Sequence, residues 1–251
     1  MKILAINSSP RITGQSKTEL LLSHLVEGLR ATLAEVEVVN LRQKKINYCS
    51  GCYTCWTKTP GICVHRDDMA LELLPKWQES DISIYASPLY HFTVNAQIKA
   101  FIEHTLPVFK PYFKADGERT THPLRGKRPA AMVLSVAGFP DDTIFDALSV
   151  WVRTAFRKNL LAEIYRPAAE SIVFSTKTED IVSAVEQAGK ELVMQKAVSP
   201  VTMQRIRQPI ADPGVLAAVV NCNWQTMINE GLTPAEAGRL RHNPRPDSIE
   251  A

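Results

Sequence analysis

Short apolar runs alternate with amphipathic segments over most of this chain. The first apolar run, Lys2 to Ile6, has the length of a strand. From Thr18 onward, apolar residues recur every three or four positions, which predicts an amphipathic helix. These apolar positions are Leu21, Leu22, Leu25, Val26 and Leu29. A second apolar segment at 36–41 predicts another strand, so the chain begins with one strand–helix–strand unit.

The same alternation continues to about residue 196. Three further strands are expected at 81–86, 129–136 and 171–174. Helices are expected from Asp67 onward and at 94–106, 143–161 and 178–196. The segment 107–127 is rich in Pro, Lys, Arg and Gly, which predicts a long loop. Alternating strands and helices predict an α/β fold with a parallel sheet and right-handed crossovers.

The pattern changes near residue 198, where prolines become more frequent. Helices are expected only at 213–229 and after Thr233, whose hydroxyl suits a helix N-cap. We therefore divide the chain into a domain of residues 1–197 and a C-terminal extension of residues 198–251.

Composition and charge exclude several classes of function. The chain is 45% hydrophobic and 22% charged, as in ordinary globular proteins. Its net charge of +3 is too small to indicate a nucleic-acid partner. No stretch approaches the roughly 18 apolar residues that a membrane-spanning helix needs, and the first apolar run is too short for a signal peptide. We expect a cytoplasmic protein, in which thiols stay reduced.

Four of the five cysteines fall within one short segment, the cysteine segment 47–66. They are Cys49, Cys52, Cys55 and Cys63. Three thiolates separated by two residues, with a fourth nearby, can converge on one metal centre. Basic residues flank them and would stabilise thiolates or an anionic cluster. These basic residues are Arg42, Lys44, Lys45, Lys58 and Arg66.

The cysteine segment allows three interpretations. The four thiolates hold a 4Fe–4S cluster, they hold a zinc ion, or they hold nothing. Zinc held by four cysteines usually has two separated C-x2-C pairs, so this compact spacing fits a cubane cluster better. His65 lies next to the segment and is either a contact to the metal or a surface histidine.

The loop after the first strand carries hydroxyl groups and one arginine where a helix begins. Free N–H groups and the helix dipole favour an anion at such a position. The hydroxyls of Ser8, Ser9, Ser16 and Thr18 and the charge of Arg11 suit a phosphate group. The loop has one glycine, Gly14, and matches neither G-x-G-x-x-G nor the P-loop. The alternative is a solvated loop whose serines only cap the helix.

This loop resembles the S-x-R-x-x-S/T phosphate loop of the flavodoxin-like NAD(P)H-dependent FMN reductases. The segment 86–104 resembles the same family's SP-x-Y-x(5)-A-x-(I/L)-K-x-F stretch. Its matching residues are Ser87, Pro88, Tyr90, Ala96, Lys99 and Phe101. The family often ends this helix in Asp-Arg, whereas Glu103-His104 stand here. We expect that departure to affect helix packing or a subunit contact more than a flavin.

The cysteine segment resembles one branch of that family, the iron–sulfur flavoproteins. Their compact C-x2-C-x2-C-x(4–7)-C motif is followed by a helix that starts with D-D-M, and Asp67-Asp68-Met69 stand here in step with it. Together the resemblances cover residues 1–195 and leave the C-terminal extension unexplained. They imply a flavodoxin-like, doubly wound five-stranded parallel sheet of order 2-1-3-4-5, and FMN at its carboxyl edge.

The resemblance also implies which residues bind FMN. Its phosphate would lie on Ser9, Arg11, Gln15, Ser16, Lys17 and Thr18. Its ring would lie between two loops, formed by Ser87, Pro88, Leu89, Tyr90, His91, Phe92 and Thr93 and by Ser135, Ala137 and Gly138. His91 is the one catalytic candidate, as a proton donor to an acceptor, and the alternative is a spacer facing the ring.

The expected function is electron transfer through FMN and the cluster. NAD(P)H or a protein would be the donor, and a small molecule or a protein the acceptor, although the sequence has no nicotinamide motif. The alternatives are a cluster-free NAD(P)H:FMN or quinone reductase and a non-enzymatic electron carrier. By resemblance we expect a homodimer or homotetramer. The cysteines follow the second strand, so we also expect them near the flavin's edge of the sheet, with the cluster close to a neighbouring subunit's flavin.

Overall fold

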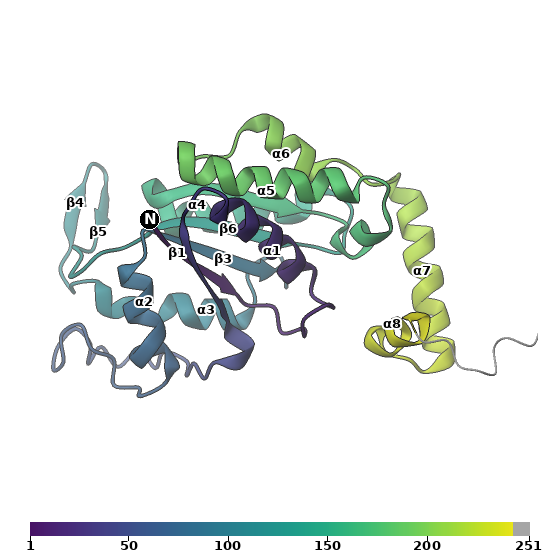
Figure 1. Ribbon diagram of the computed structural model, residues 1–251. Coiled ribbons are helices and arrows are strands. Elements are labelled where there is room, and N and C mark those ends of the chain that lie inside the picture. Colours follow the sequence, from purple (N-terminus) through teal and green to yellow (C-terminus); the bar gives the residue numbers. More distant parts are fainter. Residues whose placement is uncertain (243–251) are drawn as a thin grey trace, which may run out of the picture. The chain divides into compact units, whose positions relative to one another are not determined.

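The structure is a computed structural model that describes residues 1–242 (Figure 1). It forms two compact units, Met1–Gln208 and a second that begins at Pro209. The first unit contains the sheet and every predicted site residue, and the second is helical.

Five parallel strands form the centre of the first unit. They are β1 (Lys2–Asn7), β2 (Glu35–Asn40), β3 (Ile82–Pro88), β6 (Ala130–Val136) and β7 (Leu160–Arg166). Their order is β2-β1-β3-β6-β7, which confirms the predicted order 2-1-3-4-5. The central strands are buried almost throughout because helices cover both faces of the sheet (Figure 1).

Helices α1 (Lys17–Arg30) and α5 (Thr178–Gln195) pack on one face of the sheet. Two glycines allow these helices to approach closely. A Cβ at Gly28 would lie 1.9 Å from the carbonyl oxygen of Glu186, and one at Gly189 would lie 2.4 Å from that of Leu25. Any larger residue at either position would push the two helices apart.

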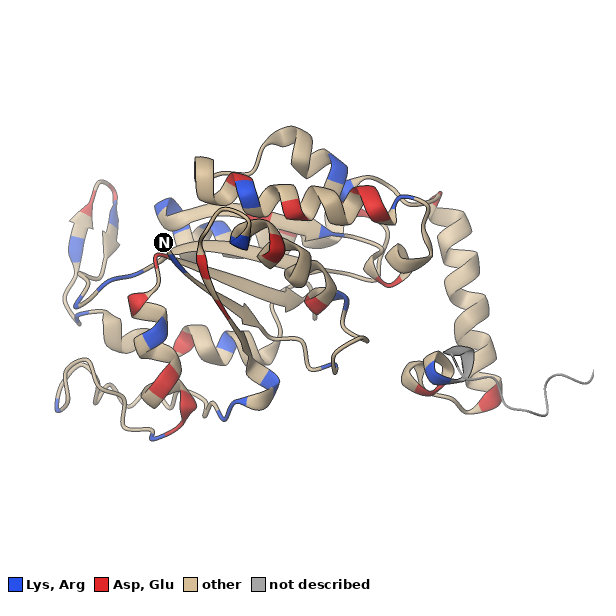
Figure 2. Cartoon of the chain, viewed as in Figure 1, with Lys and Arg blue, Asp and Glu red and all other residues tan. Residues whose placement is uncertain are grey.

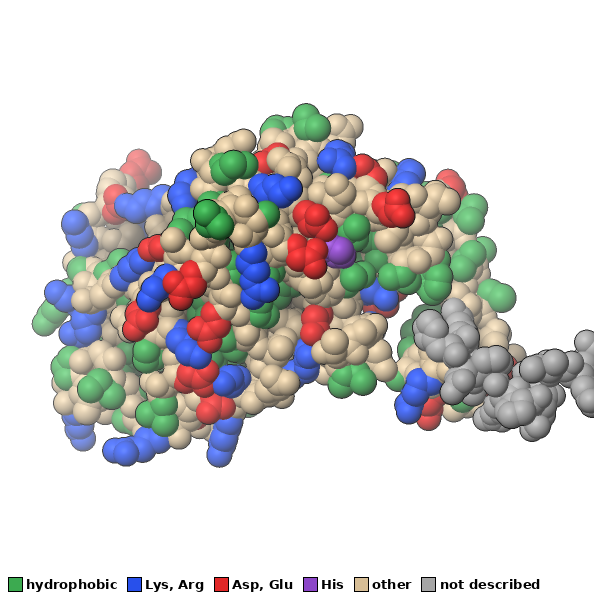
Figure 3. All heavy atoms as spheres, viewed as in Figure 1, with side chains coloured by type: hydrophobic (Ala, Val, Ile, Leu, Met, Phe, Trp, Pro, Cys, Tyr) green, Lys and Arg blue, Asp and Glu red, His purple; other side chains and the backbone are tan. Residues whose placement is uncertain are grey.

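Three helices contribute apolar side chains to the core on the other face. They are α2 (Leu74–Glu79), α3 (Ala96–Glu103) and α4 (Asp146–Phe156). Before α2 the chain forms a π-helix, η2 (Met69–Leu73). Charged side chains lie mainly on the helices and loops around the sheet (Figure 2). The face in Figure 3 carries interspersed acidic and basic side chains and no broad patch of one sign, in keeping with the low net charge.

The fifth strand lies earlier in the chain than predicted. The expected strand 171–174 belongs to a 3-10 helix, η6 (Ala169–Phe174). The expected helix 143–161 is present as η4 (Asp142–Phe145) followed by α4, but it ends at Phe156, five residues earlier than predicted. Arg157 has a φ of 49°, which ends α4, and η5 (Arg157–Asn159) leads into β7. Pairing with β6 then makes residues 160–166 a strand, because its backbone groups bond to that neighbour.

The predicted loop 107–127 contains a small hairpin of β4 (Lys114–Asp116) and β5 (Arg119–Thr121). Gly117, with a φ of 63°, provides the left-handed conformation that its turn requires. Two further 3-10 helices, η1 (Leu41–Gln43) and η3 (Leu106–Val108), follow β2 and α3.

The first unit extends beyond residue 197, because α6 (Pro200–Arg207) packs against α5 and β7. Arg166 ends β7 and is buried, and its Nη1 donates to the carbonyls of Ile206 and Gln208 at 2.7 and 2.8 Å. A guanidinium is favourable at this C-terminal end of α6. Burial lowers the pKa of Arg166 to about 10, and Asp142 opposes that shift.

The second unit contains α7 (Pro213–Glu230) and α8 (Pro234–His242), at the positions predicted for two helices. Asp212 caps α7, since its Oδ1 accepts from the N–H groups of Gly214 and Val215. Thr233 and Glu236 form a capping box at α8. None of the helices described is long and apolar enough to cross a membrane.

Candidate functional site

The predicted phosphate loop lies between the end of β1 and the start of α1. Ser9 is buried; its N–H donates to Asn7 Oδ1 at 3.1 Å and its Oγ accepts from the N–H of Arg11 at 3.3 Å. Ser16 Oγ caps α1 by accepting from the N–H of Glu19 at 3.0 Å. Ser16 therefore caps the helix, as the alternative interpretation of this loop expected. The N–H groups of Lys17 and Thr18 have no hydrogen bond to the described residues. Two donors at the start of α1 remain available to an anion.

The other residues predicted to bind the phosphate lie on the same loop or at the start of α1. Gln15 and Lys17 are half-buried, and Thr18 is buried. Arg11 Nη1 lies 2.5 Å from Oε1 of Glu170, which follows β7. This ion pair joins the first loop to the region beyond the fifth strand, so Arg11 would have to turn to reach a phosphate.

The second loop follows β3 and is held by Asn95, which sequence reasoning missed. Asn95 Nδ2 donates to the carbonyl of Ser8 at 2.5 Å, and its backbone N–H donates to Ser87 Oγ at 3.1 Å. Its Oδ1 caps α3 by accepting from the N–H of Ile98 at 3.3 Å. One buried side chain thus joins two loops and a helix. The helix was predicted to begin at residue 94, so the sequence pattern placed Asn95 inside it. The available signal was the preference of asparagine for an N-cap position.

Residues 90–93 form a strained two-residue turn. The backbones of Tyr90 and Thr93 exchange two hydrogen bonds of 3.0 Å, and His91 and Phe92 have φ values of 47° and 63°. This type I′ geometry favours Asn-Gly, so both residues are strained. Tyr90, His91 and Phe92 are exposed beyond the end of the sheet, whereas Pro88, Leu89 and Thr93 are half-buried.

The third loop begins where β6 ends. Ser135 is fully buried, lies beside Ser87 in the sheet, and its hydroxyl has no hydrogen-bond partner among the described residues. Ala137 is also buried, and its carbonyl accepts from the N–H of Ala169 at 2.8 Å. Of the three residues predicted here, only Gly138 is exposed.

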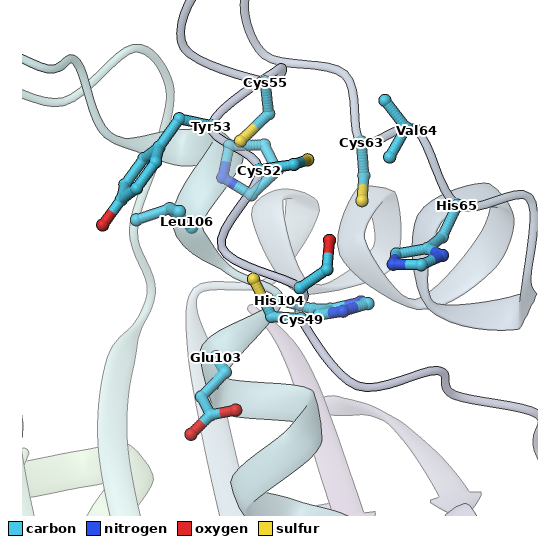
Figure 4. A pocket seen from close by; sticks show the side chains of 12 residues that line it. Cys49, Cys52, Tyr53, Cys55, Cys63, Val64, His65, Glu103, His104 and Leu106 are labelled. Carbon is cyan, nitrogen blue, oxygen red and sulfur yellow. The ribbon is translucent and has the colours of Figure 1, made fainter.

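The four cysteines of the cysteine segment line one pocket (Figure 4). All four are free thiols; Cys55 is buried, Cys49 and Cys63 are half-buried, and Cys52 is exposed. Burial raises the pKa of Cys55, and the charges of the other three cysteines raise it further. Hydrogen bonds from Thr54 and Ser50 lower the pKa of Cys52. The structure therefore brings together all four predicted metal ligands.

Two contacts fix the cysteine segment to the domain. Trp56 Nε1 donates to the carbonyl of Leu106 at 3.2 Å, just after α3. Asp67 Oδ2 accepts from the backbone and side-chain nitrogens of Asn47 at 2.7 and 3.0 Å, and its Oδ1 accepts from the N–H of Ala70 at 3.1 Å. Burial alone would raise the pKa of Asp67, but these N–H groups outweigh it and lower that pKa.

A histidine pair forms another side of the pocket. The rings of His65 and His104 are stacked, with centroids 5.5 Å apart and planes 14° apart. His104 is only 3% exposed, and neither of its ring nitrogens has a hydrogen-bond partner among the described residues. Burial lowers the pKa of His104, while the charge of Asp67 opposes that shift. Sequence reasoning placed Glu103-His104 at a packing or subunit contact, whereas both residues line this pocket.

The flanking basic residues contribute less positive charge than expected. Arg42 pairs with Glu19 at 3.0 Å, and Lys44 pairs with Glu72 at 2.6 Å. Three other flanking residues, Lys45, Lys58 and Arg66, form no ion pair with any residue that the structure describes.

The pocket lies at the far end of α3 from the second loop. Asn95 begins this helix beside Ser8 and Ser87, whereas Glu103 and His104 end it at the cysteines. A helix of eight residues is about 12 Å long. The cysteine pocket and the second loop thus lie at opposite ends of α3, and the closeness of the cysteines to the flavin's sheet edge stays a prediction.

The spacing of the sulfur atoms tests which metal centre fits. A zinc ion with four thiolates holds their sulfurs about 3.8 Å apart, because each Zn–S bond is about 2.3 Å long. In the described part of the chain, only one set of three residues of metal-binding type has all its ligand atoms within 4.8 Å of one another. It consists of His24, Glu27 and Glu186 on α1 and α5. No three cysteine sulfurs are that close. The sulfur atoms of the four thiols are therefore farther apart than a single zinc ion with four thiolates requires.

Comparison with solved structures shows the fold. The chain is similar to an NAD(P)H:quinone oxidoreductase from Methanothermobacter marburgensis, with a TM-score of 0.58 and 14% identity over 78% of this chain and 98% of the other. It is also similar to an FMN-dependent NADH-azoreductase from Bacillus anthracis in complex with FMN, with a TM-score of 0.57 and 17% identity over 76% and 98%.

Sequence comparison gives closer relatives. An iron–sulfur flavoprotein of Archaeoglobus fulgidus is 42% identical over 134 residues, which are 53% of this chain and 54% of that protein. An iron–sulfur flavoprotein of Methanocaldococcus jannaschii is 35% identical over 108 residues, which are 43% of this chain and 53% of that protein. The chain thus spans about half the length of these relatives. An FMN-dependent NADH:quinone oxidoreductase of Pseudomonas fluorescens is 24% identical over 208 residues, 79% and 97% of the two.

One family model matches more than half of this chain. The family model described as NADPH-dependent FMN reductase matches residues 1–148, which include β1, the phosphate loop, the cysteine segment and all of β6. The chain belongs to the NADPH-dependent FMN reductase family.

Proposed function

We propose that this protein is an oxidoreductase that passes electrons from NAD(P)H or a protein donor to an acceptor, through FMN and a cysteine-ligated 4Fe–4S cluster. The observation that carries the proposal is the convergence of four free cysteines on one pocket in a chain of this family. The names of the iron–sulfur flavoproteins to which the chain is similar agree with it.

The FMN phosphate would be held at the start of α1. The N–H groups of Lys17 and Thr18 supply donors, and the side chains of the loop complete the site. These side chains are Ser9, Arg11, Gln15, Ser16, Lys17 and Thr18. Arg11 would exchange Glu170 for the phosphate, a gain in charge because a phosphate carries more negative charge than a carboxylate.

The FMN ring would be held by the second and third loops. Pro88, Leu89 and the turn 90–93 offer the ring a largely apolar surface, and Ala137 and Gly138 lie on the opposite loop. Ser87 holds the backbone of Asn95, and Ser135 lies within the sheet. We therefore assign these two serines a positioning role. FMN supplies the redox chemistry, because it accepts two electrons together and can release them singly. The protein supplies the orientation and electrostatic environment of the flavin and excludes water.

The cluster would be held by Cys49, Cys52, Cys55 and Cys63. It would serve as a one-electron relay. Because Cys52 is exposed whereas Cys55 is buried, an electron-transfer partner could approach the cluster on the side of Cys52. Since the pocket is one α3 length from the flavin loops, a flavin of a neighbouring subunit can approach it as well as the flavin of the same chain. The homodimer or homotetramer expected from the family would supply such a neighbouring subunit.

A cluster-free quinone reductase is the second candidate function. It is favoured by the similarity to the FMN-dependent NADH:quinone oxidoreductase of Pseudomonas fluorescens, which extends over more of this chain than the similarity to the iron–sulfur flavoproteins. In that case the four thiols would bind no metal. NAD(P)H would reduce FMN, and the reduced FMN would reduce the acceptor directly. A non-enzymatic electron carrier would contain both FMN and the cluster and would oxidise NAD(P)H slowly.

The deciding experiment is anaerobic purification followed by an absorption spectrum and assays for iron, acid-labile sulfide and FMN. We expect one FMN and about four irons per chain, as a cubane cluster requires. Cys55→Ser should lose the iron and keep the FMN, while Cys222→Ser, at an exposed position on α7, should keep both. Flavin without iron in the wild type would support the cluster-free reductase. Iron with NAD(P)H oxidation well below about 1 per second would support the carrier.

A further inference from the structure

The orientation of His104 is not explained by the protein around it. Its ring is buried and lines the cysteine pocket, and neither ring nitrogen has a hydrogen-bond partner among the described residues. Buried polar groups almost always have a partner in a protein or in an ordered ligand. An imidazole always carries at least one N–H, so one buried donor has nothing to bond.

The neighbouring polar groups among the described residues form no hydrogen bond with the ring. The carboxylate of Asp67 already accepts from Asn47 and Ala70. Glu103 pairs with Lys99 on the exposed side of α3. The backbone of Tyr48 approaches the ring without a hydrogen bond of normal geometry.

The ring is also fixed in place. The backbone N–H of His104 bonds to the carbonyl of Ala100 at 3.2 Å as the C-cap of α3, and His65 stacks against one face of the ring. A rigid ring with a free donor therefore borders the space that the four sulfur atoms surround (Figure 4). Thiolate and sulfide sulfurs accept hydrogen bonds, and such bonds help to set the reduction potential of an iron–sulfur cluster.

We propose that His104 donates an N–H hydrogen bond to a sulfur atom of the bound cluster and thereby raises its reduction potential, while His65 holds the ring in position. The inference rests on the proposed function, because it requires the cluster. Reduction adds one electron to the cluster, and an N–H donor stabilises the added negative charge. The oxidised cluster gains less from the same bond, so the bond favours the reduced form.

The test is a redox titration of the purified, cluster-loaded protein, followed by electron paramagnetic resonance of the reduced cluster. His104→Phe keeps the ring and removes the donor, whereas His104→Gln keeps an N–H donor. For His104→Phe we expect the ratio of reduced to oxidised cluster at a fixed solution potential to be at least tenfold lower than in the wild type. This corresponds to a reduction potential lower by about 59 mV for one electron. His104→Gln should stay closer to the wild type.

His122→Phe is the matched control. His122 contacts Trp56, with ring centroids 5.1 Å apart and ring planes tilted by 49°. Its Nδ1 already bonds to the carbonyls of Lys110 and Tyr112 at 3.0 Å, and it does not line the pocket. This variant should leave the potential of the cluster unchanged. An equal shift in His122→Phe and His104→Phe would overturn the inference, since a general loss of packing would then explain both.

A second measurement on the wild type keeps the inference testable if His104→Phe does not fold. Protein labelled with 15N in histidine should show a nitrogen hyperfine coupling to the reduced cluster, and no coupling would overturn the inference. Four irons per chain with an unchanged potential in His104→Phe would also overturn it and leave the proposed function intact. Absence of iron from the wild type would overturn both, so the two failures are distinguishable.

Discussion

Asn95 and Ser8 are joined by a hydrogen bond of 2.5 Å from the side-chain Nδ2 to the main-chain carbonyl, although 87 residues separate them in the chain. Both residues are buried. The bond joins the loop after β1 to the loop after β3, so the two loops that would hold FMN have a fixed distance between them.

Asn95→Ala should therefore weaken both folding and flavin binding. It removes a buried hydrogen bond and the N-cap of α3, which together contribute about 2 kcal/mol to the free energy of unfolding. Urea unfolding and fluorescence titration with FMN measure the two effects. Asn229→Ala, at an exposed position in α7 where the side chain accepts a hydrogen bond from Gln225, should change neither. Unchanged FMN affinity in Asn95→Ala would contradict our placement of the flavin.

The turn at His91 and Phe92 should tolerate replacement well as far as folding is concerned. Asn-Gly suits its geometry, so His91→Asn with Phe92→Gly should raise the free energy of unfolding by about 1 kcal/mol. The same change should weaken FMN binding or acceptor reduction, because two exposed side chains beside the proposed ring site are lost. Urea unfolding of the apoprotein and NAD(P)H oxidation rates measure these effects. A less stable double variant would show that the two side chains support the turn.

Asp67 should make folding sensitive to acid. Its pKa is lowered in the folded state, so its contribution is present above its unfolded pKa of about 3.9 and is lost as the pH falls through the folded value. Asp67→Asn should lower the free energy of unfolding at pH 7 by about 1–3 kcal/mol. The difference between the two proteins should shrink toward pH 3, measured by urea unfolding of the apoproteins at several pH values. A difference that does not depend on pH would mean that the charge of Asp67 contributes nothing.

Gly28 should be intolerant of any side chain. Gly28→Ala would place a Cβ 1.9 Å from the backbone of α5 and should destabilise the first unit by about 1–3 kcal/mol. Gly238→Ala, in α8 with open space around the added methyl group, is the control and should leave the unfolding of the first unit unchanged. Thermal unfolding followed by far-UV circular dichroism compares the two. Equal melting temperatures for Gly28→Ala and the wild type would contradict the close packing of α1 and α5.

The sequence pattern predicted the central strands well and the last strand poorly, for a physical reason. The strands β1, β3 and β6 are buried on both faces and therefore appear as continuous apolar runs. The edge strand β7 is only half-buried over its first four residues, and it follows α4 closely, so its pattern merges with that of the helix. Only its pairing with β6, a long-range interaction, distinguishes it.

The candidate site was predictable where it depends on local spacing. The four cysteines occur close together in sequence, and the structure places them around one pocket. His104 lies far from them in sequence and reaches the pocket only because α3 runs back along the sheet. The substitution of Glu103-His104 for the family's usual pair was a visible signal, but its meaning depended on the direction of that helix.

The uneven burial of the four thiols also ranks them by chemical reactivity in the chain without a cluster. Cys52 is exposed and has a lowered pKa, whereas Cys55 is buried and has a raised one. Because the thiolate is the reactive form, alkylating reagents and peroxide should attack Cys52 first and Cys55 last. Oxidative damage to the unloaded protein would thus begin at one corner of the pocket, and repair of that single residue would restore the whole ligand set.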